Sequence, residues 1–520
     1  MLWRWASRGF AEHFLTQTFE PTTPPYDLLV IGGGINGVGI ARDAAGRGLS
    51  VLLVERADLA SATSSASSKL IHGGLRYLEQ FEFRLVHESL AEREVLLAAA
   101  PYIVRPLRFV LPVHSGLRPP WLLRLGLFLY DHIGGRKRLP PTRTVRRERD
   151  PVFNALTDGY RLGFEYSDCW TDDARLVVVN ALDAQQRGAR IEPGWAVTAA
   201  RRENALWRVD MTSHSGELRT VRSRALVNAA GPWVEEILRA AGAHRHRSLR
   251  LVKGSHIIVR RLYEGAHAYT LQNADGRVVF AIPYEEDFTL IGTTDTTFSG
   301  DPARVHADAN EIAYLCGLIS GYLKTPVTPR EVVWTYSGVR PLYDDGEASA
   351  STVTRDYVFD MDTPPGEAPL LSVFGGKLTT YRKLAEHALS KLLPVMQLNT
   401  TPWTKTATLP GGDIPRADLE SFIASQARSR PFVPPGLMRR LCRSYGTRVE
   451  RIFASAHTLS DLGAEVAPAV YEAELSLMHE EEWARTGDDA LWRRSKLGLH
   501  LDARGREAVE AWFSRQSAPS

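Results

Sequence analysis

Residues 26–55 contain the pattern that most restricts how this 520-residue chain can fold. An apolar run at 26–31 leads into a glycine turn and a helical stretch, and a second apolar run at 51–54 ends at Glu55. The turn has the GxGxxG spacing, with glycines at Gly32, Gly34 and Gly37. This order predicts a βαβ unit. Its glycine turn has no side chains, so a pyrophosphate can approach the helix N-terminus. A carboxylate at Glu55 would accept hydrogen bonds from an adenosine ribose.

Length and composition set wider limits. The length predicts two or three domains, and 44% apolar with 24% charged residues is typical of a soluble globular protein. A formal charge of +3 gives no reason to expect nucleic-acid binding. The cysteines, Cys169, Cys316 and Cys442, are too far apart for a CxxC site or a disulfide framework, which indicates a reducing compartment. No apolar run reaches the ~20 residues of a membrane-spanning helix.

Later segments predict two further kinds of structure. Strand-like runs occur at 226–229, 254–259, 278–283 and 288–292, and no regular helix separates the later ones. We therefore expect an antiparallel sheet in a separate domain. Beyond about residue 402 the pattern becomes helical, which predicts a helical C-terminal domain.

A helix is also expected at about 83–100. It carries Glu88, Glu92 and Arg93, and its polar face is interpreted as solvated.

The glycine turn alone does not distinguish NAD from FAD, because the fold binds their shared ADP half in the same way. Ser64, Ser65, Ser67 and Ser68 follow within reach of the phosphates, and a late strand at 226–231 ends in Ala-Ala-Gly. FAD proteins related to glutathione reductase are similar here. The sequence has no second GxGxxG and no CxxC, so we do not expect electrons from a bound nicotinamide nucleotide.

Three strings are more specific: SKLIHGGLRY at 68–77, WTYSGVRPL at 334–342 and FGGKLTTYR at 374–382. With the glycine turn they closely resemble the bacterial aerobic, respiratory glycerol-3-phosphate dehydrogenases. The resemblance runs from about residue 26 to 383 and resumes at 491–501. It implies non-covalent FAD, hydride transfer from C2 of sn-glycerol 3-phosphate to flavin N5, dihydroxyacetone phosphate as product, and reoxidation by ubiquinone or another respiratory quinone.

The fold implied is α/β, with a Rossmann-like FAD-binding domain of the glutathione-reductase type. We expect this domain to be interleaved with the antiparallel-sheet substrate domain within residues 26–400. The substrate-domain parts are roughly 80–170 and 245–335. Residues 401–520 would form the helical domain. Residues 1–25 are interpreted as a poorly ordered extension, with a weak targeting peptide as the alternative.

The strings supply candidate catalytic residues. Arg76 and Arg340 are expected to bind the substrate phosphate, because guanidinium matches phosphate oxygens with a planar fork. Arg340 is expected in a rigid turn between Gly338 and Pro341. Lys377 would lie near substrate or flavin N1. His72 and His256 are equal candidates for the base that takes the 2-hydroxyl proton.

The set expected to bind FAD draws on the same segments. It consists of Gly32, Gly34, Asn36, Gly37, Glu55, Ser64, Ser65, Ser67, Gly231, Gly338, Gly376, Lys377, Leu378 and Thr379.

Two acidic features have competing interpretations. Asp295 either orients an arginine or histidine, or is an ordinary turn residue after a strand. The group Asp168, Asp172 and Asp173 lacks the ligand spacing of a calcium loop, so no metal is predicted.

The sequence also leaves open alternative activities and predicts a contact with the membrane. A glycerol-phosphate or amino-acid oxidase that uses oxygen, or a redox-sensing flavoprotein without turnover, would share the FAD fold. The aromatic and leucine-rich stretch at 121–133 is too short to span a membrane but could lie at its surface. The flanking basic residues are Arg118, Arg124, Arg136, Lys137 and Arg138. We therefore expect a cytoplasmic protein attached peripherally to the inner membrane; a homodimer is one candidate assembly.

Overall fold

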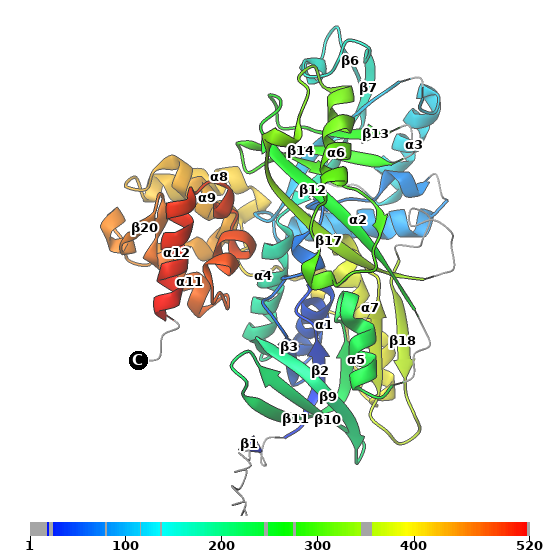
Figure 1. Cartoon of the computed structure of the whole chain (residues 1–520), viewed down its shortest axis with the longest axis vertical. Coiled ribbons are helices and arrows are strands. Elements are labelled where there is room, and N and C mark those ends of the chain that lie inside the picture. Colours follow the sequence, from blue (N-terminus) through cyan, green and yellow to red (C-terminus); the bar gives the residue numbers. More distant parts are fainter. Residues whose placement is uncertain are drawn as a thin grey trace, which may run out of the picture.

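The structure, a computed structural model, describes residues 18–19, 24–78, 81–114, 116–135, 138–243, 248–273, 277–344 and 356–516. Two large sheets and a helical C-terminal region make up this part of the chain (Figure 1). The expectation of an extension or targeting peptide at 1–25 falls almost entirely outside the described residues. Its described strand, β1 (Thr18–Phe19), pairs in parallel with β11 (Leu218–Asn228).

The first sheet contains the predicted βαβ unit. Its main path has the order β18-β19-β11-β2-β3-β8 and is parallel from β19 to β8. An antiparallel hairpin, β9–β10, extends β11. The remaining strands are β2 (Tyr26–Ile31), β3 (Val51–Glu55), β8 (Arg190–Pro193), β9 (Trp195–Glu203), β10 (Leu206–Ser213), β18 (Val358–Asp362) and β19 (Leu370–Phe374).

Helices cover both faces of this sheet, as parallel sheets require. Alternate residues of β2 point to opposite sides: Val30 packs with α1, α4 and α7, and Leu29 packs with α5 and the β9–β10 hairpin. Both are fully buried. The helices are α1 (Ile35–Gly46), α4 (Asp173–Gln186), α5 (Val234–Ala240) and α7 (Tyr381–Val395).

The second sheet is antiparallel apart from the β13–β5 pair. Helices α2 and α3 pack on one face and α6 packs on the other. The strands are β4 (Leu70–Ile71), β5 (Val104–Pro112), β6 (Arg143–Arg146), β7 (Leu162–Thr171), β12 (Leu249–Arg260), β13 (Ala268–Gln272), β14 (Val278–Tyr284), β15 (Phe288–Gly292), β16 (Thr296–Thr297) and β17 (Val332–Tyr343). The helices are α2 (Phe83–Ala99), α3 (Pro120–Ile133) and α6 (Ala309–Tyr322).

The C-terminal region lies to one side of the sheets (Figure 1). It contains α8 (Leu419–Ser429), α9 (Pro435–Tyr445), α10 (Val449–Phe453), α11 (Glu472–Glu480), α12 (Ala503–Gln516) and the strand pair β20 (Glu465–Ala467) and β21 (Val470–Tyr471). A buried carboxylate, Glu482, joins this region to α4 by binding Arg175, and it also binds Arg448 at 2.6 Å. Burial alone would raise the pKa of Glu482, but the two guanidinium groups overcome this effect and lower it to about 2.

Two of the three charges named on the polar face of α2 are not solvated, contrary to the expectation from the sequence. Glu92 is buried and accepts hydrogen bonds from Arg382 at 2.6 and 2.7 Å. Arg93 is also buried and donates to Asp168 at 2.7 Å. These charges have partners from distant segments, and such partners are not visible in a helical pattern.

The predicted fold class, a mixed α/β protein with two sheet systems and a helical C-terminal domain, is confirmed. The exact division of residues among domains stays a prediction. None of the helices in the described part of the chain has the length and apolar character needed to cross a membrane.

Candidate active site

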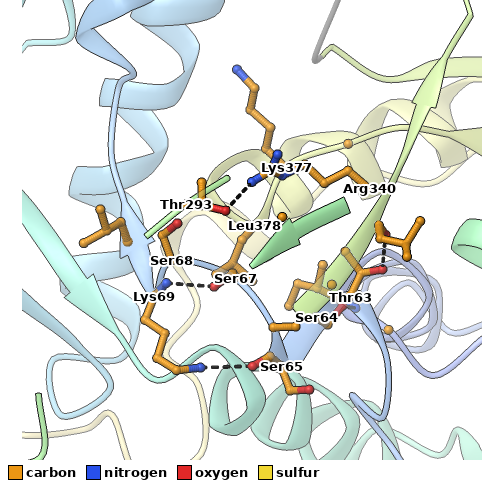
Figure 2. A pocket seen from close by; sticks show the side chains of 18 of the residues that line it. Thr63, Ser64, Ser65, Ser67, Ser68, Lys69, Thr293, Arg340, Lys377 and Leu378 are labelled. Atoms are coloured by element: carbon orange, nitrogen blue, oxygen red, sulfur yellow. Dashed lines mark hydrogen bonds between the residues drawn. The ribbon is translucent and has the colours of Figure 1, made fainter. Parts of the chain in front are cut away.

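A cavity of about 1690 Å³ is lined by residues from both sheets. Its wall includes the first turn of α1, most of residues 60–78, the middle of β17 and the turn at 375–379. Figure 2 shows part of this lining, with the hydroxyl-rich segment 63–68 contributing to the same pocket as Arg340 and Lys377. The volume exceeds the roughly 300–1,000 Å³ usual for small-ligand pockets, so a dinucleotide and a substrate can share it.

The three motif glycines have different reasons to lack a side chain. A Cβ at Gly32 would lie 2.5 Å from the Ala229 carbonyl oxygen, and one at Gly37 would lie 1.9 Å from the Gly32 carbonyl oxygen. A Cβ at Gly34 would meet only Ser64 Oγ within 4 Å, at 3.1 Å, and Gly34 faces the cavity. Packing within the protein therefore explains the outer two glycines. The middle glycine leaves room for a ligand at the α1 N-terminus.

Glu55 ends β3 at the cavity wall, as expected. Its two carboxylate oxygens accept hydrogen bonds from the backbone N–H groups of Gly33, at 2.7 Å, and Ala57, at 2.8 Å. Burial raises the pKa of Glu55, and these two hydrogen bonds oppose the change. Each oxygen has a second lone pair for a ribose hydroxyl.

The serines of the hydroxyl-rich segment do not all face the same way. Ser64 Oγ accepts a hydrogen bond from the Ile35 N–H at 3.0 Å and so lies at the start of α1. Ser65 Oγ donates to the Ala62 carbonyl at 3.2 Å. Ser67 Oγ donates to Asp173 at 2.7 Å, which directs this hydroxyl toward α4. Ser64 is therefore the best placed of the three to meet a phosphate.

The 375–379 turn lies against the first turn of α1. Gly376 has a φ of +100°, and a Cβ there would be 2.8 Å from Asn36 Nδ2. The Asn36 amide donates to the Gly375 carbonyl at 3.2 Å. Thr379 Oγ1 accepts a hydrogen bond from the His72 N–H at 3.4 Å, which connects this turn to the first of the three strings. The tertiary structure thus brings together residues separated by more than 300 positions.

Other expected cofactor residues also line the cavity. Gly231 follows β11 with a φ of +57°, Leu378 begins a helical turn, and a Cβ at Gly338 would meet Ala66 Cβ at 2.8 Å. The Lys377 ammonium lies 3.9 Å from the centre of the Tyr77 ring.

Arg340 faces the cavity from the middle of β17, so the expectation of a rigid turn at 338–341 is wrong. Strand pairing with β12 holds this stretch extended, with Val252 opposite Arg340. The guanidinium forms an ion pair with Asp295 and donates to Thr293 Oγ1 at 3.2 Å. Both interpretations of Asp295 describe part of what the structure shows, because this residue follows β15 outside any strand and also pairs with an arginine. The side chain of Arg76 lies outside the described residues.

The two candidate histidines occupy different environments. His72 is half-buried and lines the cavity, with its ring 6.2 Å from that of Phe280. His256 is only 2% exposed, and its Nε2 lies 2.9 Å from Ser68 Oγ. Burial, reinforced by the positive charges of Arg340 and Lys69, lowers the pKa of His256 well below its usual range. His72 can therefore meet a ligand directly, whereas His256 faces a hydroxyl of the wall.

The sequence reasoning missed a set of residues behind this wall. Lys69 is buried and pairs with Asp173 at 2.7 Å, and Tyr336 stacks on His256 with ring centres 4.7 Å apart. Lys69 and Tyr336 belong to the quoted strings, but Asp173 comes from the start of α4, and no local pattern indicates its role. The three aspartates considered for a metal each bind a different cation: Asp168 binds Arg93, Asp172 binds Lys496, and Asp173 binds Lys69.

Comparison with known proteins agrees with this geometry. Residues 27–382 match the family described as FAD dependent oxidoreductase, and residues 402–514 match the C-terminal domain of alpha-glycerophosphate oxidase. The chain is 51% identical to the aerobic glycerol-3-phosphate dehydrogenase of Escherichia coli (strain K12), over 94% of this chain and 97% of the relative. It is 52% identical to the D-erythritol 1-phosphate dehydrogenase of Brucella abortus, over 95% and 98%.

A solved structure shows the same architecture. The glycerol-3-phosphate dehydrogenase from Bacillus halodurans, complexed with FAD, superposes with a TM-score of 0.76 at 27% identity, covering 95% of this chain and 90% of that one. The cavity wall fits this cofactor, because the bare Gly34 and the start of α1 are suited to a pyrophosphate. FAD is the cofactor. The chain belongs to the family of FAD-dependent oxidoreductases that contains the bacterial aerobic glycerol-3-phosphate dehydrogenases.

Proposed function

We propose that this enzyme oxidises sn-glycerol 3-phosphate at C2 to dihydroxyacetone phosphate and passes the electrons to a respiratory quinone. The observation that carries the proposal is one cavity that is lined by the glycine turn at the α1 N-terminus, by Arg340 and by His72. The second candidate base, His256, lies directly behind the wall of this cavity. Relatives of about half-identical sequence named for glycerol 3-phosphate support the substrate. When bound, FAD supplies the hydride acceptor.

The protein's own residues would hold and orient the two ligands. The residues expected from the sequence to bind FAD, apart from Gly37, line the cavity. The Ser67 hydroxyl is directed to Asp173, so it is the backbone of Ser67 that we expect to face FAD. Arg340 would bind the phosphate, because Asp295 and Thr293 fix its guanidinium before the substrate arrives. Lys377 would add a second positive charge, and Arg76 is retained as a phosphate ligand.

A second substrate has a specific observation in its favour, the 52% identity to a D-erythritol 1-phosphate dehydrogenase. Both compounds are polyol phosphates, and erythritol phosphate has one more carbon. The decisive measurement is anaerobic bleaching of the bound flavin by glycerol 3-phosphate, D-erythritol 1-phosphate, glycerol and several amino acids. Bleaching by glycerol 3-phosphate at the highest kcat/KM would support the proposal. A higher value for D-erythritol 1-phosphate would transfer the assignment to the four-carbon substrate.

The α3 helix supports a lipid-soluble electron acceptor. Trp121 is 68% exposed and Phe128 is 50% exposed, so an aromatic face points to solvent. On another side of α3, Leu123 and Leu127 line the cavity together with Leu75. The cavity therefore borders a helix with an exposed apolar face, as entry of a quinone from a membrane would require.

We propose from the same surface that α3 attaches the protein to the cytoplasmic side of the inner membrane. Arg118 and Arg124 lie beside the aromatic face, where they would meet anionic headgroups. Arg136 and Lys137 lie outside the described residues. Reoxidation of the reduced enzyme by a soluble quinone analogue, compared with air, would separate a dehydrogenase from an oxidase. Faster reoxidation by air would overturn the quinone assignment.

A further inference from the structure

His256 cannot meet a ligand in the cavity directly. Its side chain is buried, and its Nε2 contacts Ser68 Oγ at 2.9 Å. Ser68 lines the cavity. A proton that travels from a ligand to His256 by this contact must therefore pass through the Ser68 hydroxyl.

Ser68 is held on both sides by one buried carboxylate. Ser67 Oγ donates to Asp173 at 2.7 Å, and Lys69 Nζ donates to the other Asp173 oxygen at 2.7 Å. Lys69 also donates to the Ser65 carbonyl at 3.0 Å and has a φ of +58°, a conformation that non-glycine residues seldom adopt. A two-sided anchor of this kind fixes where the intervening hydroxyl lies.

His256 is held by a residue that also contacts the Ser68 segment. The Tyr336 ring stacks on the imidazole, with 4.7 Å between ring centres and 19° between planes. The Tyr336 hydroxyl donates to the Ser67 carbonyl at 2.8 Å. One tyrosine therefore sets both the plane of His256 and the backbone beside Ser68.

The charges around His256 favour its neutral form. Arg340 and Lys69 are the cations that act on it, and they are paired with Asp295 and Asp173 respectively. His256 Nδ1 is buried and has no hydrogen-bond partner among the described residues. A neutral imidazole whose Nδ1 carries the proton presents the Nε2 lone pair to Ser68.

We propose that Ser68 and His256 form a two-step proton relay for the substrate hydroxyl. The substrate O–H bond breaks as an O–H bond forms on Ser68 Oγ, while the original Ser68 O–H bond breaks and an N–H bond forms on His256 Nε2. FAD, when bound, would supply the acceptor for the C2 hydrogen and its electron pair, and the substrate would leave as the carbonyl product. This inference rests on the proposed function and assigns the base to His256 acting through Ser68.

The test is anaerobic single-turnover flavin reduction in the FAD-loaded enzyme. The variants are Ser68→Ala, Ser68→Thr, His256→Gln and the Ser68→Ala/His256→Gln pair. Ser255→Ala is the matched control, because the Ser255 hydroxyl is buried next to His256 in the sequence but bonds to Ser337 Oγ at 2.8 Å. Each protein is first checked for full FAD. If Ser68→Ala does not hold FAD, Ser68→Gly, which also lacks the hydroxyl, takes its place.

We expect Ser68→Ala to slow reduction by about 10²- to 10⁴-fold, the usual contribution of general base catalysis. Ser68→Thr should recover part of the rate, and the double variant should be no slower than His256→Gln alone. The control should stay close to wild type. In mixed H₂O and D₂O, the rate should depend quadratically on deuterium content, because two protons move.

A measurement without turnover complements the kinetics. In the resting protein, Ser68→Ala should shift the ¹⁵N resonance of His256 Nε2, and Ser255→Ala should shift it much less. Wild-type reduction rates in Ser68→Ala, additive losses in the double variant, or an unchanged Nε2 resonance would each overturn the relay. If neither polyol phosphate bleaches the wild-type flavin, the proposed function fails and the relay with it.

Discussion

Replacing Arg340 with alanine should weaken substrate binding and slow flavin reduction without loss of FAD. The Arg340 side chain is 23% exposed, so an effective dielectric near 20 is appropriate. A guanidinium about 4 Å from a phosphate charge then gains roughly 4 kcal/mol, which is about a thousandfold in affinity at 1.4 kcal/mol per factor of ten. Desolvation and competition from Asp295 reduce this value, and we expect about a hundredfold loss in kcat/KM.

The ion pair with Asp295 makes the prediction sharper. In Arg340→Ala, the Asp295 carboxylate is left beside the phosphate site and repels the substrate. Arg340→Ala combined with Asp295→Asn should therefore bind substrate better than Arg340→Ala alone. Arg340→Lys keeps the charge but loses the planar fork, so it should recover only part of the activity.

Stopped-flow flavin reduction over a range of glycerol 3-phosphate concentrations is the assay for these variants. The matched control is Arg330→Ala, which removes an exposed arginine just before β17, the strand that carries Arg340. If Arg340→Ala has the wild-type limiting rate and the wild-type substrate saturation, Arg340 is a structural residue and the phosphate site lies elsewhere.

Three further predictions concern the cofactor, acid stability and the membrane. Gly34→Val should yield a protein without bound flavin, because the side chain would enter the space reserved for the pyrophosphate; a stoichiometrically yellow Gly34→Val protein would contradict this. The pKa of Glu482 is depressed in the folded state, so its stabilising effect is present above about pH 4.5 and is lost as the pH falls toward 2. Glu482→Gln should lower the free energy of unfolding at pH 7, and this free energy should then fall less steeply as the pH is lowered. Urea titrations at several pH values measure it, and the same dependence on pH in both proteins would contradict the prediction. Trp121→Ser should reduce flotation with anionic liposomes while leaving the melting temperature unchanged, and salt should weaken the wild-type binding. Equal flotation of the two proteins would exclude the α3 face.

The resemblance in the three strings led to the right family, because each string is local and remains recognisable without its partners. Residues 334–342 show the limit of this reasoning. Gly338 and Pro341 favour a turn, but the twelve residues from Val332 to Tyr343 form one strand, and eleven of them pair with β12. Strand pairing is a contact between distant segments, and it overrode the local preference of glycine and proline.

The two histidines show what only the tertiary structure decided. Both lie in glycine-rich surroundings in the sequence, and either could have been the base. Folding buries His256 behind Ser68 and leaves His72 at the cavity wall, because the β12–β15 and β12–β17 pairings enclose the imidazole between Gly292 and Tyr336.

The amino-acid sequence by itself determined the βαβ unit, the fold class, the family and its FAD, because periodicity, glycine spacing and contiguous motifs are properties of neighbouring residues. Only the tertiary structure decided the partners of the charged residues. Ion pairs join Glu92 to Arg382, Lys69 to Asp173 and Arg340 to Asp295, and the two residues of each pair come from different parts of the chain. Such pairing depends on how the sheets and helices pack against one another. A buried charge is stable only where this packing places an opposite charge beside it.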